Sequence, residues 1–434
     1  MIDKNVYSLA EAADLLAVSK QTLRRWDESG KLKPIRTPSN YRSYSLDSLT
    51  PYLGKNETSV RDSAEDYNSS PVKPYSVLEL FAGAGGLALG LEKAGLSCTL
   101  LNEIDPWACK TLRKNRPNWN VVEGDVSKES FAYLKGKIDV VTGGFPCQAF
   151  SYAGKKRGLE DARGTLFYEF ARTVKEVEPL ICVGENVRGL VTHEKGETLQ
   201  SMIDILDGLG YDVLHPQVLK AAFHNVPQKR ERLILIGIKK GTGIHFTYPK
   251  PNLEMMNLSA ALKAGSLYET DVSPSAGQSY PARKKEILEM VPPGGYWRDL
   301  PLEIQKEYML KSFYLGGGKT GMARRISWDE PCLTLTTSPA QKQTERCHPE
   351  ETRPFQVREY ARIQTFPDDW DFEGSPNQIY KQIGNAVPVN LAYAIGKELV
   401  KALNTHTVKA ELISKYQSPE THSNLVHSQQ MSLL

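Results

Sequence analysis

The sequence has few cysteines, no long apolar run and almost no excess of charge. Its six cysteines form no Cys-x-x-Cys pair and no metal-ligand spacing with the eight histidines, so we expect a reducing, cytoplasmic environment and no metal site. The apolar stretches are only strand-sized, and the start lacks the pattern of a signal peptide, so we expect no membrane contact. Lys and Arg exceed Asp and Glu by only three, so the total charge is too small to establish a nucleic-acid partner.

The composition is that of a soluble globular protein with more than one folded unit. Hydrophobic residues make up 40% and charged residues 24% of the 434 residues. The patterns divide the chain into a small unit over 1–52, a polar linker over 53–73, an α/β core over 74–238, an irregular lobe over 239–323, a return to the core over 324–404 and a polar tail over 405–434.

The first unit has the spacing of a helix-turn-helix. Apolar residues recur at helical spacing from Leu9 to Leu16, a short turn follows, and a second helix places Leu23 and Trp26 inward. Residues 20–42 hold seven basic and two acidic residues, a local patch of +5. The stretch resembles the winged helix-turn-helix of the MerR and excisionase families. The candidates for DNA contact are Lys20, Gln21, Thr22, Arg24, Arg25 and Arg42; the alternative is a packing or oligomerisation unit with a solvated basic face.

Strands and helices alternate from about residue 77. Apolar runs predict strands over 77–81, 98–102, 138–142, 180–184 and 233–238, and helical spacing predicts helices over 86–94 and 107–115. This order favours a mostly parallel sheet covered on both faces. The alternation fails over 239–322, returns with a helix over 389–403, and leaves a tail after Asn404 that we expect to fray.

A glycine-rich turn, Phe81 to Gly86, joins the first of these strands to a helix. Such a turn lets a ligand approach the backbone and presents free helix N–H groups. Glu103 and Asp125 follow the next two strands, where carboxylates can accept from ribose hydroxyls and an adenine amine. No pyrophosphate-binding set accompanies them, so S-adenosylmethionine fits better than NAD. Capping of strand ends is the alternative role for both carboxylates.

Three further strand ends carry residue types suited to covalent catalysis. Cys147 follows a Gly-Gly-Phe-Pro turn and has basic neighbours, which favours the thiolate. Glu185 ends another strand, and Arg230 and Arg232 lead into the strand over 233–238. Carboxyl ends of parallel strands meet at one edge, so these groups are expected to share a cleft. The alternatives are a buried unreactive cysteine and surface ion pairs.

Several ordered segments together resemble the DNA (cytosine-5)-methyltransferases of bacterial restriction-modification systems. They are the Phe-x-Gly-x-Gly-Gly turn, Pro-Cys-Gln, Glu-Asn-Val, Gln-x-Arg-x-Arg, and the segments 358–367 and 382–388. The resemblance runs from about Ser76 to Asn404. It implies a Rossmann-like, S-adenosylmethionine-dependent methyltransferase domain with a smaller, irregular target-recognition lobe over about 239–323.

The resemblance also implies roles for individual residues. Cys147 would add to C6 of a flipped-out cytosine, a protonated Glu185 would act near N3, and Arg232 would hold O2. Arg230 would either steady the site or contact the backbone. Ser151 and Arg163, in the basic loop after Cys147, would contact DNA. The implied cofactor pocket consists of Phe81, Gly83, Gly85, Gly86, Glu103, Ile104, Asp125, Val126, Pro146, Leu166, Asn385, Ala386 and Val387.

The expected function is methylation of cytosine C5 in a specific duplex DNA site, with a cognate restriction endonuclease acting on the same site. We expect the first unit to repress its own operon and to dimerise on the operator. The alternatives are a protein that is primarily a transcriptional regulator and a cytosine-5 methyltransferase of RNA; the long irregular lobe disfavours RNA, since duplex DNA needs such a reading surface. Candidates for DNA contact in and next to this lobe are Arg283, Lys284, Lys285, Arg298, Lys311, Arg324 and Arg325.

Overall fold

The computed structural model describes residues 6–9, 12–13, 20–30, 32–36, 42–49, 70–145 and 165–417. The chain separates into two compact units, Met1–Tyr67 and Asn68–Leu434. Residues 53–69, most of the expected linker, lie outside the described residues.

The first unit combines a small antiparallel sheet with short helices. Strand β3 (Arg42–Ser45) lies between β1 (Val6–Ser8) and β2 (Ile35–Arg36), and the β2–β3 pair is the expected wing. Helix α2 (Lys20–Glu28) is the predicted second helix, and α3 (Leu46–Leu49) follows β3. Much of the expected first helix lies outside the described residues. The core of the unit consists of Ala12, Ala13, Leu23, Leu32, Tyr44 and Leu49.

The second unit is built on an eight-stranded sheet of mixed direction. Its parallel strands are β4 (Ser76–Leu80), β5 (Ser97–Glu103), β6 (Val121–Glu123), β7 (Val140–Gly143) and β8 (Ile181–Val187). Strand β12 (Glu231–Lys239) extends the sheet beside β8, followed by β10 (Gln217–Lys220), and β9 (Tyr211–Val213) also pairs with β12. The order is β10-β12-β8-β7-β4-β5-β6.

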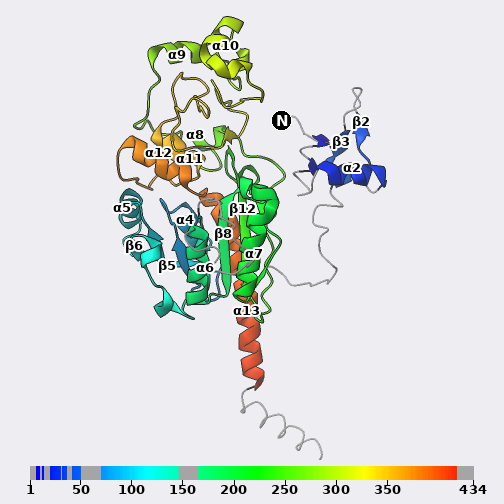
Figure 1. The fold of residues 1–434 in the computed structure, drawn as a ribbon, viewed down its shortest axis with the longest axis vertical. Helices are drawn as coiled ribbons and strands as arrows, with labels where there is room; N and C mark the ends of the chain where they lie inside the picture. The colour runs from blue at the N-terminus through cyan, green and yellow to red at the C-terminus, as the bar shows by residue number, and fades with distance from the viewer. Residues whose placement is uncertain are drawn as a thin grey trace, which may run out of the picture. The chain divides into compact units, whose positions relative to one another are not determined.

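Two pairs of helices cover the two faces of the sheet. Helices α4 (Gly86–Lys93) and α13 (Val389–Gln417) share one core with residues of one face. Helices α6 (Leu166–Val177) and α7 (Glu197–Gly208) pack on the other, in front of the sheet in Figure 1, while α13 runs behind it. The predicted α/β fold is confirmed, because apolar residues alternate between these two cores along strands such as β4.

Two expectations about this unit need correction. The run 233–238 was expected to continue the parallel alternation, but β12 is antiparallel to β8, because it follows β9 and β10 rather than a crossover helix. The tail was expected to fray after Asn404, but α13 continues to Gln417. Residues 405–417 contain good helix formers, and the next proline is Pro419.

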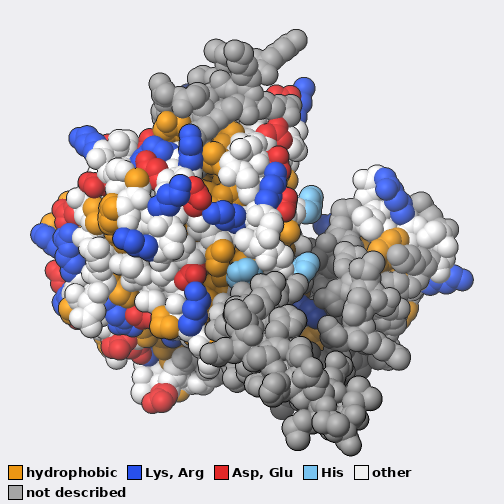
Figure 2. All heavy atoms as spheres, turned by 90° about the horizontal axis from the view of Figure 1, so that it is seen from below, with side chains coloured by type: hydrophobic (Ala, Val, Ile, Leu, Met, Phe, Trp, Pro, Cys, Tyr) orange, Lys and Arg blue, Asp and Glu red, His pale blue; other side chains and the backbone are white. Residues whose placement is uncertain are grey.

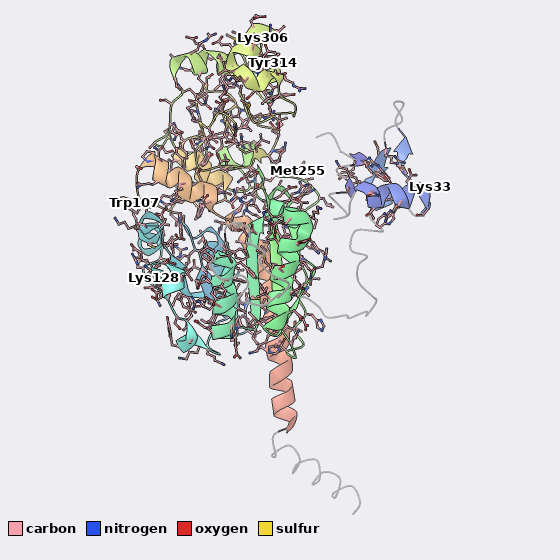
Figure 3. The ribbon with its side chains drawn as sticks, viewed as in Figure 1. Lys33, Trp107, Lys128, Met255, Lys306 and Tyr314 are labelled. Atoms are coloured by element: carbon pink, nitrogen blue, oxygen red, sulfur yellow. The ribbon has the colours of Figure 1, made fainter. Side chains whose placement is uncertain are left out.

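The region 240–331 contains no strand and has its own small core. Helices α8 (Ser259–Leu262), α9 (Ala282–Glu289) and α10 (Leu302–Met309) are short. Tyr280, Leu288 and Trp297 are among the buried residues of this lobe. Figure 3 shows Lys306 and Tyr314 at the end of the lobe farthest from the sheet.

The chain returns to the sheet through short elements. Strand β13 (Cys332–Leu333) pairs with β11 (Gln228–Lys229), and α11 (Val357–Ile363) and α12 (Pro376–Asn385) precede α13. Helix α5 (Pro106–Asn115) is the remaining α-helix of the described ranges. Short 3-10 helices occupy η2 (Val126–Lys128), η3 (Ala132–Leu134), η5 (Arg188–Val191), η6 (His193–Gly196), η7 (Ala221–Phe223), η8 (Trp297–Asp299) and η9 (Leu310–Tyr314).

Charges of both signs are interspersed on the described surface of the second unit in the view of Figure 2. This mixture agrees with the near balance of basic and acidic residues in the whole chain. No helix within the described ranges is both long enough and apolar enough to cross a membrane.

Gly90 allows α4 and α13 to approach closely. A Cβ atom at Gly90 would lie 2.4 Å from both the Ala392 Cβ and the Val389 carbonyl oxygen. We therefore predict that Gly90→Ala lowers the free energy of unfolding by about 1–3 kcal/mol through overpacking. In the control Gly208→Ala, on α7, the new Cβ meets nothing within 4 Å, so the better helix propensity of alanine should leave stability equal or higher. Denaturant unfolding measures both, and equal effects of the two substitutions would contradict the close packing.

Candidate active site

A cavity of about 730 Å³ opens at the carboxyl ends of the parallel strands. Its walls come from the turn after β4, the ends of β5, β7 and β8, the start of β12 and the segment before α13. Eleven predicted site residues line it: Phe81, Gly83, Gly86, Glu103, Ile104, Glu185, Arg230, Arg232, Asn385, Ala386 and Val387. The sheet therefore brings together catalytic and cofactor candidates, some of which are more than 300 residues apart in the sequence.

The glycine turn requires backbone conformations that favour glycine. Gly83 and Gly85 have φ values of 55° and 85°, and Phe81 itself has a φ of 58°, a strained value for a residue with a side chain. A Cβ atom at Gly86 would lie 2.2 Å from the carbonyl oxygen of Val387. The absence of a side chain at Gly86 is thus what allows the start of α4 to meet the segment before α13.

Glu103 holds this turn to the end of β5. Its carboxylate accepts hydrogen bonds from the backbone N–H groups of Gly83 (2.7 Å), Ile104 (2.9 Å) and Asp105 (2.7 Å). Glu103 therefore performs the capping role and also lines the cavity. The neighbouring Ile104 is 66% exposed, which leaves a large apolar side chain free on the cavity wall.

Four cofactor candidates do not line this cavity: Gly85, Asp125, Val126 and Leu166. Asp125 instead caps η2, where its carboxylate accepts from Ser127 N (2.9 Å) and Oγ (2.8 Å). These hydrogen bonds, the backbone one first, lower the pKa of Asp125. The observed contact of Asp125 is thus the capping alternative that the sequence left open.

Glu185 and Arg232 form a buried ion pair at the base of the cavity. The Arg232 Nε lies 2.6 Å from the Glu185 Oε1, with both side chains about nine-tenths buried. Strands β8 and β12 are antiparallel, and Arg232 pairs with Val187. Glu185 is therefore a diagonal neighbour of Arg232 on the same face of the sheet. The two residues expected to act together are in contact.

Arg230 has a different environment from Arg232. It is 1% exposed, and its guanidinium donates to the carbonyl oxygens of Leu335 (3.3 Å) and Asn385 (3.4 Å). Burial, and then the charge of Arg232, lowers the pKa of Arg230 to about 9. Arg230 thus joins two cavity walls through main-chain contacts, in line with a steadying role.

The strand end that precedes the predicted nucleophile lies beside Glu185. The Asn186 side chain donates to the carbonyl oxygen of Phe145 (2.8 Å), and a Cβ at Gly144 would lie 3.0 Å from the Glu185 Oε2. Four predicted site residues that follow Phe145 lie outside the described residues: Pro146, Cys147, Ser151 and Arg163. Among the residues that are described, no group of side chains could hold a metal ion.

Sequence reasoning missed several residues of the cavity. Thr334–Thr337 form one wall of the cavity. Gly384 packs against this segment: a Cβ atom at Gly384 would lie only 2.2 Å from the Thr336 carbonyl oxygen. Lys381 forms an ion pair of 2.8 Å with Asp105 at the cavity, so that α12 and α5 are linked there. Glu79, in β4, lines the floor. Neither the three threonines of 334–337 nor Lys381 carries a sequence signal that predicts a position at the cavity.

Two of the candidates for DNA contact in and next to the lobe, Arg325 and Lys284, make contacts within the protein. Arg325 is 4% exposed and donates to the carbonyl oxygens of Val291 and Leu288, each at 2.7 Å, so its expected DNA contact is wrong. Lys284 contacts the buried Glu345 and donates to the Ala340 carbonyl oxygen. These two side chains stabilise the lobe internally.

The basic face of the first unit is carried by α2. Lys20, Gln21, Arg24 and Arg25 are exposed, and Thr22 is half-buried. Arg42 differs, because its Nε lies 2.7 Å from the Asp27 carboxylate. The pair neutralises part of the expected patch and ties the wing to α2.

Comparison with known families finds a match in each unit. The family described as C-5 cytosine-specific DNA methylase matches residues 75–401, and the MerR family of regulatory proteins matches residues 8–44. The chain therefore belongs to the C-5 cytosine-specific DNA methylases, and it is an enzyme that methylates DNA.

Two curated relatives match almost the whole chain. The type II methyltransferase M.Eco47II of Escherichia coli is 61% identical over 404 residues, which cover 92% of this chain and 97% of the relative. M.PspPI of Psychrobacter sp. (strain TA137) is 56% identical and covers 92% of this chain and 97% of its own length. The family and these relatives confirm the resemblance drawn from the ordered motifs.

A solved structure has a similar fold over most of the chain. It is described as a DNA modification methyltransferase encoded within a prophage of E. coli, with a TM-score of 0.60 and 25% sequence identity. The match covers 76% of this chain and 99% of the other. The Rossmann-like methyltransferase fold expected from the sequence is thereby confirmed.

We predict that Arg232→Ala lowers the rate of DNA methylation about 100- to 1,000-fold, because it removes the buried cation that faces Glu185. The matched control is Lys239→Ala, at the opposite end of β12, whose ion pair of 3.0 Å with Glu178 lies away from the cavity. Single-turnover methylation by each folded variant measures the effect. A loss of less than tenfold for Arg232→Ala, or equal losses for both variants, would show that the buried pair is only structural.

Proposed function

We propose that the cavity binds S-adenosylmethionine and that a flipped-out cytosine reacts beside it. Three features of one wall support the binding of this methyl donor: the glycine turn, the apolar side chain of Ile104 and the carboxylate of Glu103. When bound, S-adenosylmethionine supplies an electrophilic methyl group. Phe81 and Ile104 would contact its adenine, and Glu103 would accept from its ribose hydroxyls.

Cys147 is the proposed nucleophile. Its thiolate adds to C6 of cytosine, which gives C5 the character of an enamine carbon and makes it nucleophilic. After C5 is methylated, a base removes the C5 proton, the C5–C6 double bond reforms and the thiolate leaves. The five described cysteines are all buried, and burial raises the pKa of Cys109, Cys182 and Cys332 to about 12. Of the six cysteines, Cys147 has the neighbours that best favour a thiolate.

Glu185 and Arg232 are proposed to neutralise charge on the ring. Addition of the thiolate places negative charge on N3 and O2. In this proposal Glu185 takes up a proton as the cytosine enters and donates it at N3, while Arg232 donates to O2. Their 2.6 Å contact supports this proposal, because two groups so close together can both reach one pyrimidine ring. Because they are about nine-tenths buried, their interaction with the ring is weakly screened by solvent.

The proposed biological role is protection of host DNA at the site cut by a cognate restriction endonuclease. Cytosine C6 is hidden in a duplex, so the base must leave the helix before the thiolate reaches it. Ser151 and Arg163 remain the proposed contacts to the DNA around the flipped base. The names of the type II relatives support this role.

We predict that Cys147→Ala abolishes both methylation and covalent capture of DNA. In DNA with 5-fluorocytosine at the target, the fluorine cannot leave as a proton does, so the covalent complex of the unsubstituted enzyme should survive denaturing electrophoresis. The control Cys109→Ala removes a buried thiol that does not line the cavity and should retain capture. Capture of DNA by the Cys147→Ala variant would contradict the proposed nucleophile.

The first unit is proposed to bind operator DNA and repress the operon of the enzyme. The exposed basic residues of α2 support this role, as does the match to the MerR regulators. In a helix-turn-helix the second helix enters the major groove, and dimers bind palindromic half-sites. Dimerisation on such an operator is part of the proposal.

We predict that Arg24→Ala combined with Arg25→Ala weakens binding of the full chain to DNA upstream of its gene. The log–log slope of affinity against salt concentration should fall by about one for each phosphate that no longer has a cationic partner. Lys33→Ala is the control, since Lys33 is exposed but lies after α2. Fluorescence anisotropy over a salt series measures both variants. If the double variant binds as the unsubstituted chain does, α2 is not the DNA-reading helix.

A further inference from the structure

One wall of the cavity, residues 334–337, is irregular chain that buried side chains hold in place. Strand β13 ends at Leu333, and the wall follows it. Buried backbone groups outside strands and helices need other hydrogen-bond partners. Here the Leu335 N–H donates to the Gln228 Oε1 (2.9 Å), and the Leu335 carbonyl oxygen accepts from Arg230 (3.3 Å). The position of this wall therefore depends on the side chains that bind its backbone.

Arg346 binds the first carbonyl oxygen of the wall. Its Nη2 and Nε donate to the Thr334 carbonyl oxygen at 2.6 and 3.2 Å, and its Nη1 donates to the Glu345 carbonyl oxygen at 2.6 Å. Arg346 is 4% exposed, and burial lowers the pKa of its guanidinium. A buried cation held by carbonyl oxygens alone is costly, and proteins keep such costly groups mainly at functional sites.

The residue before Arg346 is anchored in the core of the lobe. Glu345 is fully buried, and its carboxylate accepts from the Ala323 N–H (2.7 Å) and from the Tyr308 hydroxyl of α10. The same carboxylate contacts Lys284 of α9. Two consecutive residues thus face in different directions, because Glu345 binds the lobe while Arg346 binds the cavity wall. They connect the lobe to the cavity.

The wall leads from Arg346 to the proposed reaction site. Leu335 follows the residue that Arg346 binds, and its carbonyl oxygen accepts from Arg230. The charge of the nearby Arg232 contributes to the lowered pKa of Arg230, and Arg232 itself contacts Glu185. A displacement of the wall would therefore move Arg230 and change the surroundings of the buried ion pair.

We propose that Arg346 is a positioning residue for the methylation of DNA. It holds the wall of residues 334–337, and through this wall Arg230, in the position that the lobe sets. The inference rests on the proposed reaction site at Glu185 and Arg232. Arg346 does not line the cavity. Its loss therefore lowers the rate of the reaction and leaves the affinities for DNA and for the methyl donor unchanged.

Kinetics of Arg346→Lys test this role, because lysine keeps the charge but lacks the planar fork of donors. The substrate is a duplex that carries the methylated site mapped in cells. In single turnovers at saturating DNA and methyl donor, we expect the rate constant to fall about 10- to 100-fold through misplacement of the wall. Both Kd values should stay unchanged. If denaturant unfolding shows that this variant does not fold, the uncharged Arg346→Gln replaces it with the same expected result.

The matched control is Arg325→Lys. Arg325 is also 4% exposed and also donates to main-chain carbonyl oxygens, but those of Leu288 and Val291 lie in the lobe and not in the wall. Its folded variant should keep the rate constant of the unsubstituted chain. Equal rate losses in the two lysine variants, or a loss of DNA affinity with an unchanged rate constant in Arg346→Lys, would overturn the inference.

A double-mutant cycle tests the route through Arg230. Arg230→Lys and Arg346→Lys release the same wall, so their combined loss of rate should be smaller than the product of the two single losses. Losses that multiply overturn this route. A normal rate in Arg232→Ala overturns the proposed reaction site, and the inference with it. A slow Arg232→Ala beside a normal Arg346→Lys overturns the inference alone.

Discussion

The close approach of α4 to the start of α13 is the constraint on which the rest of the structure depends. Gly86 and Gly90 have no side chains, so the backbone near Val387 and Val389 packs directly against α4. This contact joins the helix that follows β4 to a segment some 300 residues later in the chain.

Buried charge is the second feature that organises the site. Three sets of charged groups at the cavity have different kinds of partner: Glu103 accepts from three main-chain N–H groups, Glu185 contacts Arg232, and Arg230 donates to carbonyl oxygens. A buried ion pair adds little to stability by itself, because its desolvation offsets the attraction. Its value lies in a charge distribution arranged before the substrate arrives, which needs little reorganisation during the reaction.

The sequence predicted the parts of the site that follow strands directly. Glu103 and Glu185 lie at or near the carboxyl ends of parallel strands, which meet at one edge of the sheet. Arg232 lies at the start of the apolar run of β12 and reaches the same edge because β12 is antiparallel to β8. Thr334–Thr337 and Lys381 could not be placed, because tertiary contacts of the returning chain bring them to the cavity. The burial of Arg325 could not be predicted either, because the sequence around a basic residue in an irregular lobe does not distinguish a buried side chain from an exposed one. The antiparallel direction of β12 depended on β9 and β10, whose short runs gave weak signals.

The central claim is that one cavity, with Cys147 as its nucleophile, methylates cytosine at a specific DNA site. The most direct test maps 5-methylcytosine at base resolution in the genome of a cell that lacks its own cytosine methylation and expresses the full chain. The account predicts complete methylation of one short recurring sequence, absent when Cys147 is replaced by alanine. Methylation that persists with Cys147→Ala, or no methylation by a folded chain that binds the methyl donor, would contradict it.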